Sequence, residues 1–198
     1  MVRLRDIWTC LYPYAIFRTG RDVYLTFDDG PIPEVTPEVL AILHCYDVKA
    51  TFFMVGENID KHPDVFAQVV KAGHTIGNHS YNHLKGWKYS FDEYLANVKK
   101  FPKATKLFRP PYGKATLRQR RALHNMGYRL IYWDILTRDY DASVSTEQII
   151  NKIKRQVRPG SIINFHDSLK SNERMLEALP TVIEWLQAQG YELKALTI

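Results

Sequence analysis

The feature that most constrains this 198-residue chain is a regular alternation of short β-rich runs with segments of helical periodicity. Runs of β-branched and aromatic residues predict seven strands, at 23–27, 50–55, 74–78, 106–109, 128–135, 161–165 and 191–196. Between them, apolar residues at i, i+3, i+4 spacing predict helices at 36–46, 63–72, 90–101, 116–126, 145–157 and 173–189. Such alternation predicts parallel strands joined by right-handed crossovers, in a barrel or an open sheet.

Short blocks of acidic, basic and other polar residues follow five of the seven predicted strands, and this distribution favours the barrel. An open sheet would instead gather its ligand-binding residues at one switch point. The length suits one domain with a substantial core. Glycine-rich loops of the kind that bind nucleotides are absent from the sequence.

The first residues combine a basic start with an apolar stretch, over 1–17, that superficially resembles a signal peptide. Pro13 interrupts the stretch, no small-residue cleavage site follows, and its length falls short of the roughly 20 residues that span a bilayer. We therefore expect residues 1–20 to pack on the main domain, over 21–198, or to touch a membrane surface. This pattern favours a cytoplasmic or membrane-peripheral protein.

The net charge of +6 would favour an anionic partner, but the basic residues are spread along the chain. Their densest run, at 118–121, lies in a predicted helix and is typical of a solvated face. Aromatic and basic residues do not alternate as on a platform that stacks single-stranded bases. The sequence predicts no nucleic-acid partner, and we expect a monomer.

Two histidines and a pair of aspartates suggest a metal site. His79 and His83 are four residues apart, which on a helical turn puts both imidazoles on one face. Asp28 and Asp29 end a predicted strand, where adjacent side chains point to opposite sides, so that one can hold a metal while the other works beside it. Each block alone also suits a surface pair or a turn.

Together, two histidines and one aspartate leave an open coordination position, as catalytic zinc requires. The same ligands describe the facial triad of non-haem iron oxygenases, although those proteins usually carry the triad on an all-β fold.

Two further blocks carry acid, base and oxyanion chemistry. Arg109 follows an apolar strand and can orient a carboxylate, while the prolines after it fix the chain so that the Tyr112 N–H could serve as an oxyanion donor. His166 ends another strand and could protonate a leaving group if a carboxylate keeps it charged, with Asp139 as the candidate partner. A rigid turn and a satisfied buried histidine are the structural alternatives.

In this order and spacing, the blocks resemble the motifs of the polysaccharide deacetylase family, carbohydrate esterase family 4. They read TFDDGP at 26–31, HSYNH at 79–83, RPPYG at 109–113, WDILTRDY at 133–140 and NFHD at 164–167. The resemblance runs from about residue 23 to residue 191. It implies an α/β fold, a distorted (β/α)7 barrel in a single domain, and metal-dependent hydrolysis of an N-acetyl, or sometimes O-acetyl, group of a sugar.

The resemblance also implies a role for each matched residue. The expected metal ligands are Asp29, His79 and His83, and the expected catalytic residues are Asp28 as base, Arg109 as its orienting partner, Tyr112 as oxyanion donor, His166 as acid and Asp139 as the aspartate that tunes it. The expected substrate contacts are Tyr112, Trp133, Tyr140 and Asn164.

Two residues depart from the family pattern. Tyr140 stands where the family often has tryptophan, and Asn164 stands where a leucine commonly lines the acyl pocket. A polar wall at that place would leave the catalytic residues intact but change the accepted acyl group, for example to formyl.

The expected function is therefore removal of acetyl or another small acyl group from an acetylated amino-sugar oligosaccharide, polysaccharide or glycolipid. One divalent metal ion is expected, Zn²⁺ first, with Co²⁺, Mn²⁺ or Ni²⁺ as alternatives. Two other functions stay open: a hydrolase of the same superfamily that acts on a non-sugar C–N bond, and a catalytically silent glycan-binding domain. The intact acid, base and ligand set argues against the silent domain.

Overall fold

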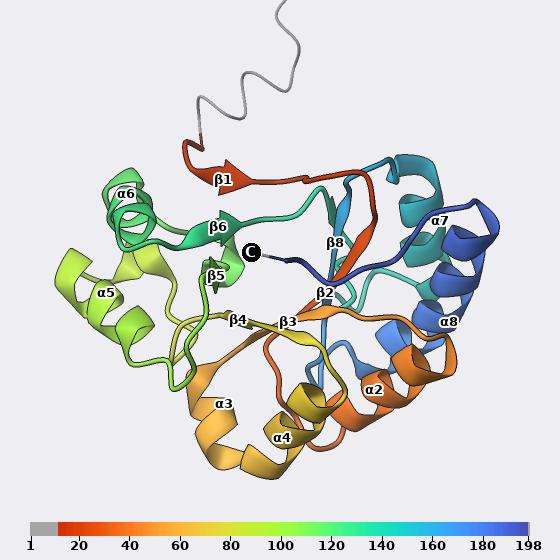
Figure 1. Ribbon diagram of the computed structural model, residues 1–198, viewed down its shortest axis with the longest axis horizontal. Helices are drawn as coiled ribbons and strands as arrows, with labels where there is room; N and C mark the ends of the chain where they lie inside the picture. The colour runs from red at the N-terminus through yellow and green to blue at the C-terminus, as the bar shows by residue number, and fades with distance from the viewer. Residues whose placement is uncertain (1–11, 198) are drawn as a thin grey trace, which may run out of the picture.

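A curled parallel sheet organises the molecule. The computed structural model describes residues 12–197 and places eight strands in the order β1-β6-β5-β4-β3-β2-β8-β7 (Figure 1). The strands are β1 (Ala15–Ile16), β2 (Tyr24–Asp28), β3 (Thr51–Met54), β4 (Thr75–Asn78), β5 (Leu107–Phe108), β6 (Arg129–Ile131), β7 (Ile135–Leu136) and β8 (Ile162–His166). Every pair of neighbouring strands is parallel, which confirms the predicted single α/β domain with a distorted barrel.

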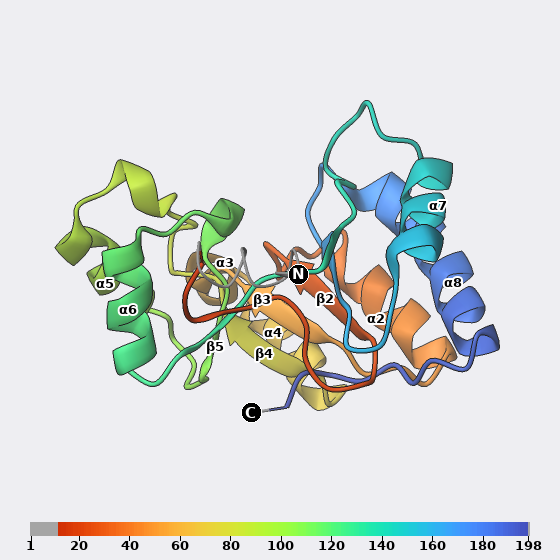
Figure 2. The same cartoon turned by 90° about the horizontal axis from the view of Figure 1, so that it is seen from above.

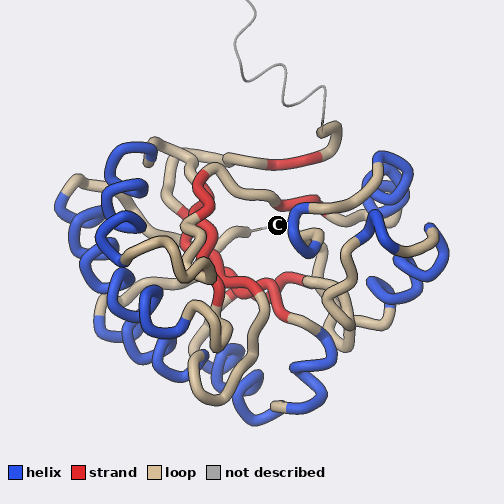
Figure 3. Tube along the Cα trace, turned by 180° about the vertical axis from the view of Figure 1, so that it is seen from behind, coloured by secondary structure: helices blue, strands red, loops and turns tan. Residues whose placement is uncertain are grey.

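Helices cover the outside of the sheet, as Figures 2 and 3 show from two further directions. They are α2 (Thr36–Cys45), α3 (Gly56–Lys61), α4 (Pro63–Lys71), α5 (Phe91–Lys99), α6 (Leu117–Asn125), α7 (Thr146–Gln156) and α8 (Asn172–Ala188), with short 3₁₀ turns at Gly86–Lys88 and Pro111–Gly113. Ser90, Thr116 and Ser145 form capping boxes that fix where α5, α6 and α7 begin.

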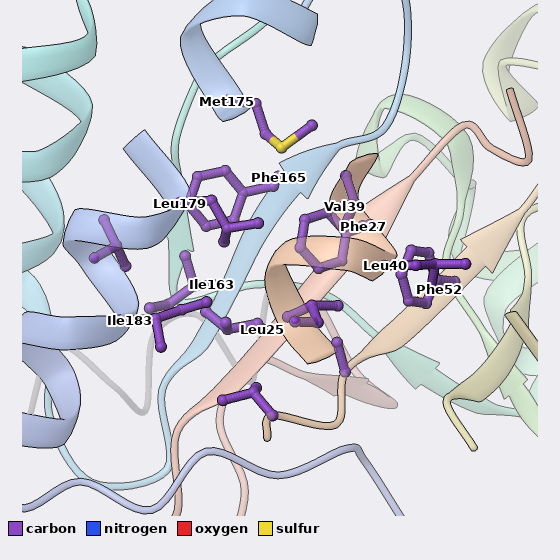
Figure 4. Packing of buried hydrophobic residues seen from close by; sticks show 14 of the residues in the cluster. Leu25, Phe27, Val39, Leu40, Phe52, Ile163, Phe165, Met175, Leu179 and Ile183 are labelled. Carbon is purple, nitrogen blue, oxygen red and sulfur yellow. The ribbon is translucent and has the colours of Figure 1, made fainter. Parts of the chain in front are cut away.

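The main core lies between the sheet and α2 and α8. Phe27, Phe52 and Phe165 stack on adjacent strands, with ring centroids 5.0 and 5.8 Å apart. Side chains of the two helices, such as Leu40 and Leu179, pack against these rings (Figure 4). Because side chains alternate along a strand, burying these rings against the helices turns their neighbours toward the barrel interior.

The register of β2 and β8 aligns those interior positions. Thr26 pairs with Asn164 and Asp28 pairs with His166. Phe53 of β3 pairs with Asp28 on one side and with Gly77 of β4 on the other, so the carboxyl ends of these strands lie at one level. Polar side chains from separate parts of the sequence therefore meet at one end of the barrel.

The structure corrects two predicted strands. Residues 128–135 form two strands, because residues 132–134 cross from β6 near one edge of the sheet to β7 at the other. The prediction of a strand at 191–196 was wrong: apart from a single bridge between Val23 and Leu193, this segment leaves the sheet. It turns toward the middle of the ring of strands, where Leu196 joins an interior cluster with Phe53 (Figure 1).

Apart from the short 3₁₀ turns, the helix α3 and the edge strand β1 were not predicted. β1 pairs with β6, and Arg18 beyond it bridges Ser161 next to β8, so the described part of the N-terminal segment lies against the sheet. Residues 1–11, on which the rest of that expectation falls, lie outside the described residues. No helix in the described part of the chain is both long and apolar enough to cross a membrane.

Candidate active site

Three potential metal ligands converge at the carboxyl end of the barrel. Asp29, His79 and His83 each offer a ligand atom, and these atoms all lie within 4.8 Å of one another. The Nε2 atoms of His79 and His83 are 3.7 and 3.2 Å from Oδ1 of Asp29. Burial alone would raise the pKa of Asp29, but the hydrogen bond from His83 and the charges of nearby histidines lower it, which favours the anionic form that a metal requires.

His79 is oriented as a metal-binding histidine would be. Its Nδ1–H donates to the backbone carbonyl of Arg109 at 2.8 Å, which leaves the Nε2 lone pair free to face the cluster. Burial lowers the pKa of His79 to about 4, so its ring is neutral near pH 7 and can coordinate a cation. These donors fit a divalent ion of the zinc type.

The two histidines do not lie on a helical turn, which corrects the expectation from their spacing. Residues 79–83 form an irregular turn in which Ser80 and His83 have φ values of 64° and 54°. Side chains support it: Asn78 accepts a hydrogen bond from the Ser80 N–H at 2.7 Å, and Asn97 of α5 accepts two more from the turn. Sequence reasoning missed both asparagines.

Asp28 and Arg109 form a buried ion pair beside the ligand cluster. Arg109 is fully buried, and its Nη1 donates to Oδ1 of Asp28 at 2.6 Å. The same guanidinium donates to the carbonyls of Ile131 and Tyr132 and lies over the Phe53 ring, 4.1 Å from its centroid. Held on all sides, Arg109 fixes the direction of the Asp28 carboxylate, whose Oδ2 lies 3.9 Å from Nε2 of His79.

Asn164, which was expected to line the acyl pocket, lies within hydrogen-bond distance of both members of this pair. The side chain has no exposed surface. Its Nδ2 donates to Oδ2 of Asp28 at 3.0 Å, and its Oδ1 accepts from Nη1 of Arg109 at 2.6 Å. Asn164 pairs with Thr26, which precedes Asp28 by two residues on β2 and lies deeper in the barrel. The amide therefore reaches the Asp28 carboxylate from the interior of the barrel.

His166 and Asp139 form a second acid–base pair. The Nδ1–H of His166 donates to Asp139 Oδ1 at 2.8 Å, and the His166 backbone N–H donates to Oδ2 at the same distance. Burial would lower the pKa of His166, but the hydrogen bond and charge of Asp139 more than reverse this and raise it to about 9. His166 is therefore protonated near pH 7, with Nε2 directed away from Asp139.

Aromatic side chains flank the site. The ring of Tyr112 packs against His83 at 4.7 Å, and the ring of Tyr140 meets His166 edge-on at 4.8 Å. Both tyrosines are partly exposed, whereas Trp133 lies against Gly113, where an added Cβ would come within 2.9 Å of the indole. Tyr112 has a φ of 58°, and no described residue accepts a hydrogen bond from its backbone N–H.

Asp167 is a further residue that sequence reasoning left without a role. It accepts hydrogen bonds from the Gly30 N–H at 3.0 Å and from the Thr36 hydroxyl at 2.6 Å. Burial raises its pKa to about 8. A side chain on Gly30 would collide with this carboxyl group, so the pair fixes the turn that follows Asp29. The adjacency of His166 and Asp167 was the only sequence signal for it.

Comparison with known proteins identifies relatives that are named as deacetylases. The sequence profile described as "Polysaccharide deacetylase" matches residues 18–131. A peptidoglycan-N-acetylglucosamine deacetylase of Bacillus cereus is 35% identical, over 85% of this chain and 83% of its own length. A chitooligosaccharide deacetylase of Azorhizobium caulinodans is 33% identical, over 91% of this chain and 95% of its own length.

Solved structures share the fold over most of the chain. A peptidoglycan N-acetylglucosamine deacetylase matches with a TM-score of 0.89 and 33% identity, over 96% of this chain and 93% of that one. A pseudoenzyme of the CE4 family from Bacillus anthracis matches with a TM-score of 0.84 and 28% identity, over 99% of this chain and 70% of that one. The same fold thus carries both active and inactive members, so the side chains of the site decide between them.

Proposed function

The chain belongs to the polysaccharide deacetylase family, and from that premise we propose that it hydrolyses the N-acetyl group of an amino sugar in a glycan. The observation that carries the proposal is the Asp29–His79–His83 cluster directly beside the buried pair of Asp28 and Arg109. The two relatives named above act on glycans with acetylated amino sugars. The partly exposed tyrosines beside the site suit stacking on sugar rings.

Asp29, His79 and His83 would hold the divalent ion, Zn²⁺ first by the chemistry of this donor set. When bound, such an ion lowers the pKa of water and polarises a carbonyl group. The chain contributes the neutral imidazole of His79 and the carboxylate of Asp29 that this binding needs.

Asp28 is the proposed general base, which takes the proton of the attacking water. Arg109 and Asn164 hold one oxygen each of its carboxylate, so that Oδ2 faces the cluster without rotating away. The Tyr112 N–H, for which the described residues supply no acceptor, is the proposed donor to the oxyanion that forms on the amide carbonyl.

His166 is the proposed general acid. Asp139 keeps it protonated and fixes its ring, and the free Nε2–H can be donated to the leaving nitrogen. The products are a carboxylate, acetate in the proposed case, and the free amino sugar. No covalent intermediate with the protein is needed.

Acetate release from a panel of acetylated oligosaccharides tests this function. Release that depends on added Zn²⁺, Co²⁺, Mn²⁺ or Ni²⁺ would support it and would rank the metals. Glycan binding without release would indicate a silent domain, as in the pseudoenzyme relative. Cleavage restricted to cyclic amides would indicate the non-sugar hydrolase.

The metal ligands give a direct prediction. We expect purified protein to carry about one divalent ion, and His79→Ala or His83→Ala to lose most of it, because two remaining ligands do not form a stable site. Elemental analysis after dialysis measures the content. His74→Ala is a matched control, since that buried histidine instead accepts a hydrogen bond from the Ala50 N–H. Full metal content in both ligand variants would refute the assignment.

The position of Asn164 gives a second prediction. Asn164→Leu leaves Asp28 and Arg109 each short of one hydrogen bond in a buried setting, a loss of about 1–3 kcal/mol. We expect a fall in kcat of roughly ten- to a hundredfold, with little change in acyl preference. Thr26→Val removes an acceptor of Arg109 but no donor to Asp28, and it should cost less.

Kinetics with N-formyl, N-acetyl and N-propionyl substrates, together with melting temperatures, separate the two roles of Asn164. An altered acyl preference at unchanged kcat would contradict this prediction and would indicate that Asn164 lines the acyl pocket.

A further inference from the structure

An open groove of about 1060 Å³ runs from the candidate active site along the seam between the two edges of the sheet. We call it the seam groove. One end is formed by Tyr112, Gly113 and Trp133, and the ring of Tyr112 also contacts His83, so this end adjoins the ligand cluster. The other end is formed by Arg18, Lys152, Arg158 and the residues around them.

The curl of the sheet produces the seam groove. β1 lies at one edge of the sheet and β7 at the other, and the link 132–134 crosses between them. In Figure 1 the segment with β1 passes over β6 and then descends beside β8 into β2. Residues of α7 and of the turn before β8 complete the lining. The groove is therefore built from β1, β7 and α7 together with the connecting segments between them.

Positive charge outweighs negative charge in the lining. Among the described residues, the basic side chains that line the seam groove are Arg18, Lys114, Lys152 and Arg158, and the acidic one is Asp134. The Asp134 carboxylate is shared, since Oδ1 lies 2.6 Å from Nη2 of Arg158 and 3.9 Å from Nε of Arg18. Within residues 12–197, Lys152 has no carboxylate partner, and its Nζ donates to the backbone carbonyl of Leu136.

The environment of Lys152 favours an incoming anion. Burial and the neighbouring charge of Arg138 lower the pKa of Lys152, which means that its ammonium group is poorly compensated where it stands. A carboxylate beside Lys152 would stabilise its ammonium group against both the burial and the repulsion from Arg138. Concave surfaces of one charge also concentrate ions of the opposite charge.

We propose that the seam groove binds a carboxylate-bearing stretch of the glycan, with Lys152 and Arg18 facing the acid group while the acetylated sugar lies at the ligand cluster. Trp133 and Tyr112 offer aromatic faces for the sugar rings between these two points. The proposal rests on the proposed function for the placement of the acetylated sugar. It extends that function by assigning an acidic glycan as the preferred substrate class.

Binding without turnover tests the proposal separately from catalysis. In the Asp28→Asn background, titration calorimetry compares a neutral N-acetylglucosamine oligomer with an oligomer of equal length that carries carboxylates on neighbouring sugars. We expect the carboxylated oligomer to bind more tightly, with an advantage that shrinks as salt rises. Lys152→Gln and Arg18→Gln should each weaken its binding by roughly two- to fivefold and leave the neutral oligomer unaffected.

Lys61→Gln is the matched control, because this exposed lysine on α3 pairs with Glu57 and does not line the groove. Equal affinity for the two oligomers would overturn the proposal, as would equal losses for both oligomers in Lys152→Gln. Acetate release by the wild-type protein from the neutral oligomer tests the proposed function on its own. If acetate release fails while the charge-dependent binding persists, the proposal that the seam groove binds an acidic glycan is supported and the proposed deacetylase function is refuted.

Discussion

Asp28→Asn is expected to lower kcat by roughly 10²- to 10⁴-fold, the range for a positioned general base, while metal content stays unchanged. An amide in place of the carboxylate cannot accept the proton from water. It would still accept one hydrogen bond from Arg109, so the buried guanidinium keeps a partner and the fold should survive. Asp28 is not in the ligand cluster, which explains why the metal should remain.

Asp29→Asn is the matched control one residue along the chain. It removes a ligand that both histidines face at 3.2 and 3.7 Å, so we expect loss of metal together with activity. Elemental analysis and single-turnover kinetics on the same preparations distinguish the two variants. If Asp28→Asn loses metal and Asp29→Asn keeps it, the two roles must be exchanged.

The adjacency of these aspartates shows what the sequence can predict. Alternation of strands and helices places strand ends at one face of a parallel sheet, whatever the exact register. Asp28, His79, Arg109 and His166 lie at or directly after the ends of separate strands, and the structure brings all four together. Chemistry at strand ends is thus predictable, because it depends on strand order and direction and not on the details of packing.

Details that depend on long-range packing were not predictable. The β-rich run at 128–135 contains no sign that the chain crosses from one sheet edge to the other, since each of the two resulting strands includes buried apolar residues. The turn that carries His79 and His83 is held by Asn97 of α5, a residue in no recognisable relation to it along the sequence. Local spacing suggested a helical turn, and these tertiary contacts override it.

Asn164 shows that the depth of a side chain within the barrel is also difficult to predict from sequence. Its place two residues before His166 puts both side chains on the same face of β8. Depth could not be deduced: the amide lies below the site, within hydrogen-bond distance of Asp28 and Arg109, because β2 and β8 pair in register. We propose that a polar residue at that depth supports the base, whereas the family resemblance implied a contact with substrate.

The protonation state of His166 should determine how activity depends on pH. Because protonated His166 is the donor, activity should persist at neutral pH and be lost as the pH rises through its pKa of about 9. Asp139→Asn removes the main group that raises this pKa, so the alkaline limb of kcat/KM should move to lower pH. A limb that does not move in Asp139→Asn would show that another group titrates there.

His166→Ala should lower kcat/KM by roughly 10²- to 10⁴-fold for N-acetyl amides and much less for activated aryl acetates. An amine leaves only after it is protonated, whereas an activated phenolate leaves without help, so the cost of losing the acid follows the leaving group. Tyr140→Phe is the matched control, because it keeps the ring that contacts His166 edge-on while removing only a hydroxyl group. Equal losses for amides and activated esters would mean that His166 stabilises the site without donating a proton. A loss confined to amides would locate the proton transfer at its Nε2, on the side of the ring opposite Asp139.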